Sequence, residues 1–318
     1  MSEMTALRVE RAGPLALLQD AGRFGVRRLG VTQGGPLDLH GWAWANALLG
    51  NSWGAPALEI ALGGGLTLIA ESDSTLALAG GDLSATLDGE PLLPWQSFSI
   101  RAGQRLTFAA PKTGVRAYLA APGGFQAEPV LGSVASVVRE ELGGFDGYGR
   151  TLRAGDRLEF RPAARALREV PQDRRVDYTS APLLALIPGA QIGDFGGVSL
   201  YRAFNQDWRV DERADRMGIR LTGTPLACAV DSMISEGIAL GAVQVPPDGQ
   251  PIVLLNDRQT IGGYPRLGAL TPLACSRLAQ CAPGQSVRFV AQSLYRAQRE
   301  HRRFMAGFAS DAPFSRDG

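Results

Sequence analysis

The sequence predicts a mainly β protein with two domains, and three observations lead to that prediction. The 318 residues are long enough for two domains of ordinary size. The chain holds 40 glycines and 20 prolines, which indicate many turns and therefore many short elements. Short strand-like segments separated by turn residues recur along both halves, a pattern typical of a barrel or a sandwich.

The first half contains a regular series of segments that are typical of strands. They are 66–69, 75–79, 83–87, 97–100, 105–108 and 115–120. Asp88 and Gly89 follow the third of them and predict a hairpin, because glycine tolerates the positive φ that a two-residue turn needs.

One helix is expected in the first half, at residues 37–49 (LDLHGWAWANALL), where apolar residues recur at helical spacing. Pro36 suits the first helical position, and Asp38 suits the first turn near the positive end of the helix dipole. Gly50 and Asn51 offer a left-handed stop.

The second half repeats this style. The segments 183–187, 218–221, 238–245 and 252–255 are predicted strands. Thr271 and Pro272 are expected to cap a short helix that ends near Gln280, and a last helix is expected to begin near Ser293.

A weak internal repeat supports two related β domains. AGQRLTF (102–108), AGDRLEF (154–160) and PGQSVRF (283–289) each predict a turn followed by a half-exposed strand. The charged segment around 163–178 contains few aliphatic residues and indicates a boundary. We therefore expect domains at 1–165 and 181–306, a linker at 166–180 and a loose tail at 307–318.

The composition excludes several classes of protein. The formal net charge of +1 gives no electrostatic basis for binding nucleic acid or an anionic membrane. No apolar run approaches the roughly 20 residues of a membrane span, and the N-terminus carries no signal pattern. Three cysteines without a CxxC pair and two histidines favour a reduced, cytoplasmic protein and argue against a metal site.

Two segments of the first half have both structural and functional interpretations. The glycines in 20–51 bring backbone amides within reach of a ligand or of neighbouring chain, and the helix behind Pro36 presents a positive end to an anion; a turn and a capped helix explain the same residues. Glu59 lies among apolar residues and needs a partner if buried, such as Arg23 or Arg27, and we favour a structural role for it.

Two segments of the second half carry further candidates. Asp215 and Arg216 (DERADRMGIRLTG, 211–223) are either a surface charge pair or groups that face a cleft, and spacing alone does not decide. In 241–268, the Pro-Asp-Gly turn predicts a hairpin that joins 243–245 to 252–255. The polar groups and the glycine pair that follow, within 256–264, favour a binding site on a loop after a strand.

No motif in the chain names a reaction by itself, but several blocks together resemble a known family. They are DAGRFG, ANALLGN with APALEIAL, VLGSVASVVREELGGFDGYGRTLRAGD (131–156), ADRMGIRL and GAVQVPPDGQPIVLLNDRQTIGGYPRLG. In this order they resemble the biotin-dependent carboxyltransferase-like, or KipA-like, family, which is also called allophanate hydrolase subunit 2 or the 5-oxoprolinase C subunit.

The resemblance implies cyclophilin-like β-barrel domains and a multi-subunit enzyme. A C subunit would work with a KipI-like B subunit, together with a LamB/YcsF-like A subunit, to open 5-oxoproline to glutamate; ATP would be used by the complex, and no cofactor would be bound covalently. Carboxyl transfer to urea or a similar amide, and a KipA-like regulatory role, are the alternatives; a prolyl isomerase rests on fold analogy alone.

The resemblance also directs attention to candidate roles for the site residues. Activating a lactam requires donors for the developing charge on its carbonyl oxygen. We expect catalytic roles for Asp257, Gln259, Thr260 and Asp215, and substrate-binding roles for Arg23, Arg216, Gln244, Gly262, Gly263, Tyr264 and Asp38. The chain departs from the family in residues 132–136, where an arginine is lost, in Gln33-Gly34-Gly35, in His40 and in Arg266.

Overall fold

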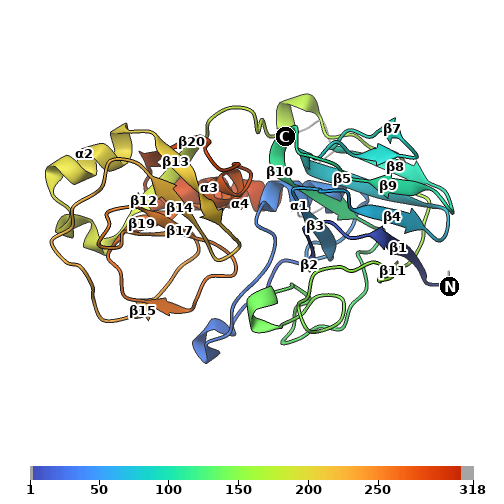
Figure 1. The fold of residues 1–318 in the computed structure, drawn as a ribbon, viewed down its shortest axis with the longest axis horizontal. Helices are drawn as coiled ribbons and strands as arrows, with labels where there is room; N and C mark the ends of the chain where they lie inside the picture. The colour runs from blue at the N-terminus through green and yellow to red at the C-terminus, as the bar shows by residue number, and fades with distance from the viewer. Residues whose placement is uncertain (1–2, 309–318) are drawn as a thin grey trace. The chain divides into compact units, whose positions relative to one another are not determined.

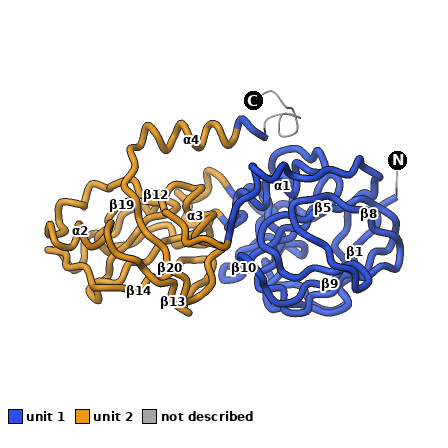
Figure 2. The backbone as a smooth tube through the Cα atoms, turned by 90° about the horizontal axis from the view of Figure 1, so that it is seen from above, with its two compact units in different colours: residues 1–23, 34–178, 306–318 blue, residues 24–33, 179–305 orange. Residues whose placement is uncertain are grey.

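The computed structural model describes residues 3–308, which divide into two compact units (Figure 2). Within these residues, unit 1 comprises 3–23, 34–178 and 306–308, and unit 2 comprises 24–33 and 179–305. The break after Tyr178 falls inside the segment 166–180 that the sequence predicts as a linker. Residues 24–33 belong to unit 2 although they precede most of unit 1 in the chain, an arrangement that the sequence did not predict.

Unit 1 consists of two antiparallel sheets and one long helix (Figure 1). The six-stranded sheet has the order β11 (Arg157–Phe160), β1 (Thr5–Arg11), β4 (Thr67–Ala70), β9 (Arg105–Thr107), β6 (Thr86–Leu87) and β7 (Glu90–Pro91). The five-stranded sheet has the order β2 (Leu15–Gln19), β3 (Ala57–Ala61), β10 (Thr113–Ala120), β5 (Ser74–Asp82) and β8 (Gln96–Ile100). Both sheets contribute side chains to a single apolar core, for example Leu7, Leu58 and Leu119.

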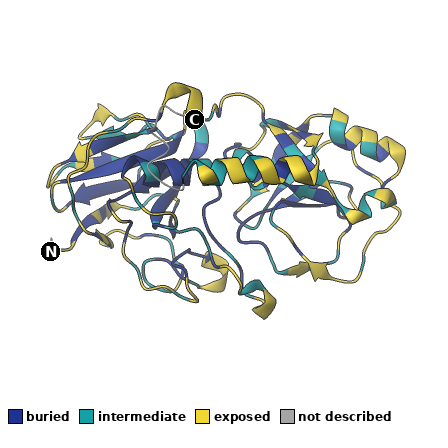
Figure 3. Ribbon diagram, turned by 180° about the vertical axis from the view of Figure 1, so that it is seen from behind, coloured by how far each residue is buried: buried dark blue, intermediate teal, exposed yellow. Residues whose placement is uncertain are grey.

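The strands of unit 2 close into a barrel. Its order is β12 (Leu183–Pro188), β19 (Arg266–Leu270), β16 (Ala242–Gln244), β17 (Ile252–Leu254), β14 (Gly218–Thr222), β13 (Trp208–Ala214) and β20 (Ser286–Ala291). The helices α2 (Gly197–Asn205), α3 (Pro272–Ala279) and α4 (Leu294–Ala306) and the short ribbon β15 (Glu236–Gly237) with β18 (Ile261–Gly262) complete it. The predicted mainly β class is confirmed, and Figure 3 shows the strands buried beneath exposed loops.

Turn chemistry explains why the predicted hairpins form. Asp88 and Gly89 join β6 to β7 with φ of 50° and 90°, as a two-residue turn requires. In the second hairpin the amide of Gly249 donates to the carbonyl of Pro246 at 2.9 Å, and β16 pairs with β17 as predicted. The three repeat segments lead into β9, β11 and β20, each after a glycine with positive φ.

The long helix of unit 1 begins later than the sequence predicted. α1 spans Leu39–Leu48, and Asp38 is its N-cap, with the carboxylate accepting from the amide of His40 at 2.9 Å. Pro36 therefore lies before the cap and not in the first helical position. The carboxylate of Asp38 already occupies this helix end, so the segment is explained as a turn with a capped helix.

A buried polar network anchors the start of α1. The hydroxyl of Tyr118 donates to Glu59 at 2.6 Å and accepts from the amide of Asp38 at 2.7 Å. Tyr178 donates to the carboxylate of Asp38 at 2.6 Å, and the amide of Leu37 donates to Glu59 at 2.9 Å. Burial, followed by the charges of Glu59 and Asp38, raises the pKa of Tyr118 well above its usual value.

The segment between the units is only partly a free linker. The amide of Thr75 donates to Ala163, that of Ser97 to Arg168 and that of Val170 to Trp95, all at 2.9–3.1 Å. Residues 163–170 therefore hydrogen-bond along unit 1. At the end of the described chain, Phe308 packs edge-on against Trp44 at 5.1 Å, and the remainder of the predicted tail, 309–318, lies outside the described residues.

Within residues 3–308, no helix is both long enough and apolar enough to cross a membrane. The three cysteines, Cys228, Cys275 and Cys281, are free thiols. Cys275 lies in α3, where burial raises the pKa of its thiol to about 12. A thiol that stays protonated at neutral pH is a packing residue rather than a nucleophile.

The Tyr118 network gives a stability prediction. Tyr118→Phe removes a donor from buried Glu59 and an acceptor from a buried amide, so it should lower the free energy of unfolding by about 1–3 kcal/mol. Tyr148→Phe is the control, because Tyr148 is 72% exposed. Urea unfolding followed by tryptophan fluorescence measures both; equal stability of the two variants would contradict the anchoring role of the network.

Candidate functional site

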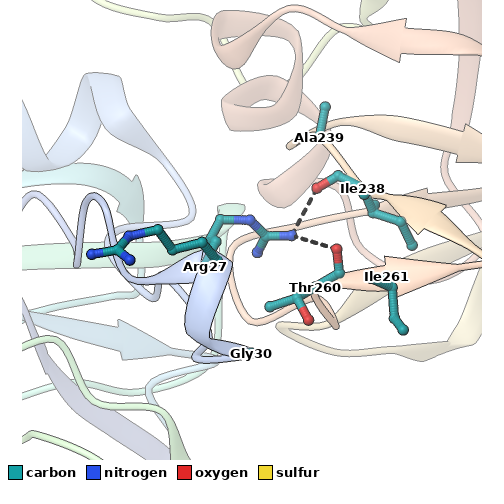
Figure 4. A pocket seen from close by; sticks show the side chains of 8 residues that line it. Arg27, Gly30, Ile238, Ala239, Thr260 and Ile261 are labelled. Carbon is teal, nitrogen blue, oxygen red and sulfur yellow. Dashed lines mark hydrogen bonds between the residues drawn. The ribbon is translucent and has the colours of Figure 1, made fainter.

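Unit 2 contains an open pocket of about 670 Å³ (Figure 4). Three stretches that are distant in sequence line it: Arg27, Arg28 and Gly30; Gly237, Ile238 and Ala239; and Thr260 with Ile261. The second and third stretches belong to or adjoin the β15–β18 ribbon, in which Gly237 pairs with Ile261. The amide of Ile238 extends this pairing by donating to the carbonyl of Thr260 at 3.0 Å.

Arg27 holds the first stretch against the other two (Figure 4). It begins the 3₁₀ turn Arg27–Leu29, which ends at Gly30 with φ of 81°. One nitrogen of its guanidinium, Nη2, donates to the carbonyls of Ile238 at 2.8 Å, Gln259 at 3.2 Å and Thr260 at 3.3 Å. These three carbonyls lie at the ends of the ribbon, and the arginine supplies their donors.

A second arginine lies behind the pocket wall. Arg258 is 3% exposed and donates to the carbonyls of Ile238 at 3.3 Å and Leu255 at 3.1 Å, with a longer contact to the side chain of Gln33 at 3.5 Å. Burial, and next the positive charge of Arg27, lower the pKa of Arg258 to about 10. Two guanidinium groups thus share the carbonyl of Ile238.

Four of the predicted site residues lie at or beside this pocket. Thr260 lines it, and Gln259 contributes a carbonyl to Arg27. Gln244 is 2% exposed, and its Nε2 has no acceptor among the described residues. Gly262 lies against this amide: a Cβ there would come within 2.9 Å of Nε2 and 2.5 Å of Cδ1 of Ile238, so a larger residue would require these two side chains to move.

Three other predicted residues form contacts that do not involve the pocket. Arg216 and Asp257 make a bidentate ion pair, with nitrogen–oxygen distances of 2.8 and 2.9 Å, and each side chain is 6% exposed. Asp215 is exposed, and its carboxylate accepts from the amides of Met217 and Gly218 at 2.8 and 3.0 Å. Asp215 does not pair with Arg216, which was one of the two interpretations of that segment.

The last two residues of the predicted loop have different surroundings. The carbonyl of Gly263 accepts from the amide of Met233 at 2.8 Å, and a Cβ on Gly263 would come within 2.7 Å of the carbonyl of Met233. Tyr264 is 42% exposed. Their substrate-binding roles stay predictions.

The two predicted residues of unit 1 are enclosed by their own chain. The guanidinium of Arg23 donates to the carbonyls of Val130, Ser133 and Ala135 at 2.9, 3.1 and 2.6 Å, and the residue is 1% exposed. Asp38 is fully buried as the cap of α1. These contacts stabilise loops and a helix end. Glu59, for which an arginine partner was considered, accepts from the hydroxyl of Tyr118 and the amide of Leu37.

Sequence reasoning did not identify the pocket residues Arg27 and Ile238 or the arginine behind them, Arg258. One sequence feature could have indicated Arg27. It lies between Gly25 and Gly30, in the glycine-rich segment that was predicted to approach a ligand or neighbouring chain, and both glycines have positive φ in the structure. Its partners are more than 200 residues away in sequence, so spacing gave no indication of them. Arg258 lies within the polar loop that was predicted as a binding site, but it was not among the predicted site residues.

A barrel of this topology, joined to a two-sheet unit, matches a known class of protein. Residues 29–291 match the family described as carboxyltransferase domain, subdomain A and B, and the chain belongs to that family. One relative makes the assignment more specific. The 5-oxoprolinase C subunit of Escherichia coli strain K12 is 38% identical over 92% of this chain and 93% of that one.

The solved structure of the protein TTHA0988 has a TM-score of 0.80 and 38% identity, and the match covers 91% of this chain and 56% of that one. The urea amidolyase of K. lactis has a TM-score of 0.83 and 25% identity. Our chain is covered to 95% in that comparison but spans only 20% of the amidolyase, so the fold also occurs within a much longer chain.

The buried ion pair of unit 2 gives a prediction that separates structure from catalysis. Asp257→Ala leaves the guanidinium of Arg216 buried without its carboxylate, and it should lower the free energy of unfolding by about 3–5 kcal/mol. Asp248→Ala is the control, because Asp248 is 52% exposed in its pair with Arg220 and should cost about 1 kcal/mol or less. Urea unfolding measures both, and an unchanged midpoint for Asp257→Ala would contradict a structural role for the pair; the catalytic role of Asp257 stays a prediction.

Proposed function

We propose that this chain is the C subunit of an ATP-dependent 5-oxoprolinase that converts 5-oxoproline to glutamate. The observation that carries the proposal is the 38% identity to the 5-oxoprolinase C subunit of E. coli, which extends over nearly the full length of both chains. A second relative with the same name, from Haemophilus influenzae, is 35% identical over 91% of this chain. Each match covers more than nine-tenths of both chains, so the name of each relative refers to the region that this chain matches.

The reaction opens a five-membered lactam. The carbonyl carbon–nitrogen bond breaks, the oxygen of one water joins the carbonyl carbon, and a proton goes to the departing nitrogen. A second water is consumed as ATP becomes ADP and phosphate. Charge develops on the carbonyl oxygen, and donors placed around it lower the barrier. Thr260, which lines the pocket, and the buried Nε2 of Gln244 beside Gly262 are the donors that unit 2 offers to such an oxygen.

We assign the use of ATP to the complex as a whole; the sequence of this chain contains no recognisable phosphate-binding loop. The proposed partners are a KipI-like B subunit, in the cytoplasm with this chain, together with a LamB/YcsF-like A subunit. The match to little more than half of TTHA0988 supports a role as one component of a larger assembly. Catalysis by this chain alone is not expected.

Carboxyl transfer to urea or a similar amide is the second candidate. It is favoured by the 27% identity to the urea amidolyase of Saccharomyces cerevisiae, of which the chain covers 17%. That activity would require carboxybiotin from another chain, because no biotin-carrier lysine motif is present in this sequence.

Reconstitution tests the proposal. The chain is mixed with its KipI-like and LamB/YcsF-like partners, 5-oxoproline and ATP, and glutamate and ADP are measured. Glutamate that forms only when this chain is present supports the proposal. A complex that assembles without forming glutamate would contradict it, and addition of urea with a biotin carboxylase and carrier then tests the second candidate; failure of both leaves the regulatory role.

Within the active complex, Thr260→Val should lower turnover by about tenfold or more, which corresponds to the loss of a transition-state hydrogen bond. Thr224→Val removes a hydroxyl from an exposed residue elsewhere in unit 2 and serves as the matched control. Equal turnover of the two variants would exclude Thr260 from the reaction.

A further inference from the structure

We infer that the pocket of unit 2 is an anion site that binds the carboxylate of the substrate, so that the protein selects amides bearing a carboxylate over neutral ones. The inference rests on the proposed function, since it assigns one part of the substrate to one part of the pocket. It concerns the residues Arg27, Arg28 and Arg258, which the bond-breaking chemistry itself does not require.

The pocket is lined by positive side chains and by no acidic one. Arg27 and Arg28 contribute to its wall, and the other lining residues are glycine, alanine, isoleucine and threonine. The acids nearest in sequence to the wall are engaged elsewhere. Glu236, next to Gly237, is bound by Arg266 and Gln191, and Asp257 is paired with Arg216. The local charge of the pocket is therefore positive.

Arg258 adds a buried charge that the fold neutralises poorly. The partners of its guanidinium are two backbone carbonyls and one amide side chain, so they are dipoles and not charges. Burial and then the charge of Arg27 lower the pKa of Arg258, while Asp257, which is already paired with Arg216, offsets only part of that effect. An anion bound on the other side of the shared Ile238 would offset the repulsion between Arg27 and Arg258.

The remaining wall fits the body of a small amide. Ile238, Ala239 and Ile261 supply apolar surface, with Ile261 59% exposed at the rim, and Thr260 supplies one hydroxyl. A guanidinium is suited to a carboxylate because it binds one through charge-assisted hydrogen bonds. Nη2 of Arg27 is engaged with three carbonyls, so we assign the direct contacts to the guanidinium of Arg28 and the supporting charge to Arg27. A ring with a single carboxylate uses both kinds of surface, whereas urea has neither a charge nor an apolar face.

Competition in the reconstituted complex tests this assignment. 2-Pyrrolidinone has the same lactam ring as 5-oxoproline but no carboxylate, so it should bind at least about tenfold more weakly than 5-oxoproline. The KM for 5-oxoproline should rise with ionic strength, while the inhibition constant of 2-pyrrolidinone should stay constant, because only the charged ligand is screened. Equal binding of the two lactams would overturn the inference.

Two variants locate the effect in the pocket. Arg27→Gln should raise the KM for 5-oxoproline about tenfold or more. Because it also removes the donor from the carbonyl of Thr260, the 2-pyrrolidinone constant is measured beside it and should rise by a smaller factor. Arg28→Gln, which removes a charge from a second residue of the pocket wall, should also raise KM without affecting folding. Arg220→Gln, in the exposed pair with Asp248, is the control and should leave KM unchanged. Unchanged KM in both pocket variants would overturn the inference even if glutamate is formed.

Ligand binding to the isolated chain distinguishes a failure of the anion-site inference from a failure of the proposed 5-oxoprolinase function. Thermal shifts with 5-oxoproline, glutarate, 2-pyrrolidinone and inorganic phosphate require no turnover. If glutamate never forms but both carboxylates protect the chain in an Arg27-dependent way, the anion site stands and the proposed function fails. Protection by phosphate that exceeds protection by both carboxylates would overturn the carboxylate assignment and identify a phosphate site.

Discussion

Backbone carbonyls that leave the strands need donors, and in this protein arginine side chains supply many of them. Arg23 binds three carbonyls of the 130–135 loop, and Arg27 binds three around the β15–β18 ribbon. The two residues lie on either side of the point where the chain passes from unit 1 to the segment 24–33 of unit 2. These guanidinium groups add hydrogen bonds to carbonyls of the glycine-rich loops, where the backbone is irregular.

An arginine that donates to a carbonyl keeps its net positive charge, whereas an arginine that pairs with a carboxylate forms a neutral pair. The Arg216–Asp257 pair is neutral as a whole, so it can be buried without attracting another charge. Arg258 is buried as deeply but donates to carbonyls and an amide, which leaves its positive charge in place. The same arrangement that completes the backbone hydrogen bonds therefore creates a positive region beside an apolar pocket. The arginine–carbonyl hydrogen bonds therefore contribute both to the stability of the fold and to the preference of the pocket for an anion.

The sequence predicted what depends on local chemistry. The Asp88-Gly89 hairpin, the Pro-Asp-Gly turn, α3 behind Thr271 and the three turn-plus-strand repeats all follow from residues within a few positions of each other. It also located the polar loop around Thr260 and Gly262. It did not reveal that Asp257 is held by Arg216, that Asp38 caps α1 rather than lying inside it, or that Arg27 reaches Ile238. Each of these contacts is decided by tertiary packing, and a single sequence contains no distance information between such positions.

The assignment of residues 24–33 to unit 2 has a consequence for how the chain acquires its structure during synthesis. These residues leave the ribosome long before the first strand of the barrel, with residues 34–178 of unit 1 in between. At about 5–20 residues per second, that interval is roughly seven to thirty seconds. During it, Arg27 has no carbonyls of the ribbon to bind, and the exposed Phe24 and Leu29 lack their final surroundings. The nascent chain therefore carries residues 24–33 before their partners in unit 2 exist, and unit 2 is completed by residues that were synthesised first.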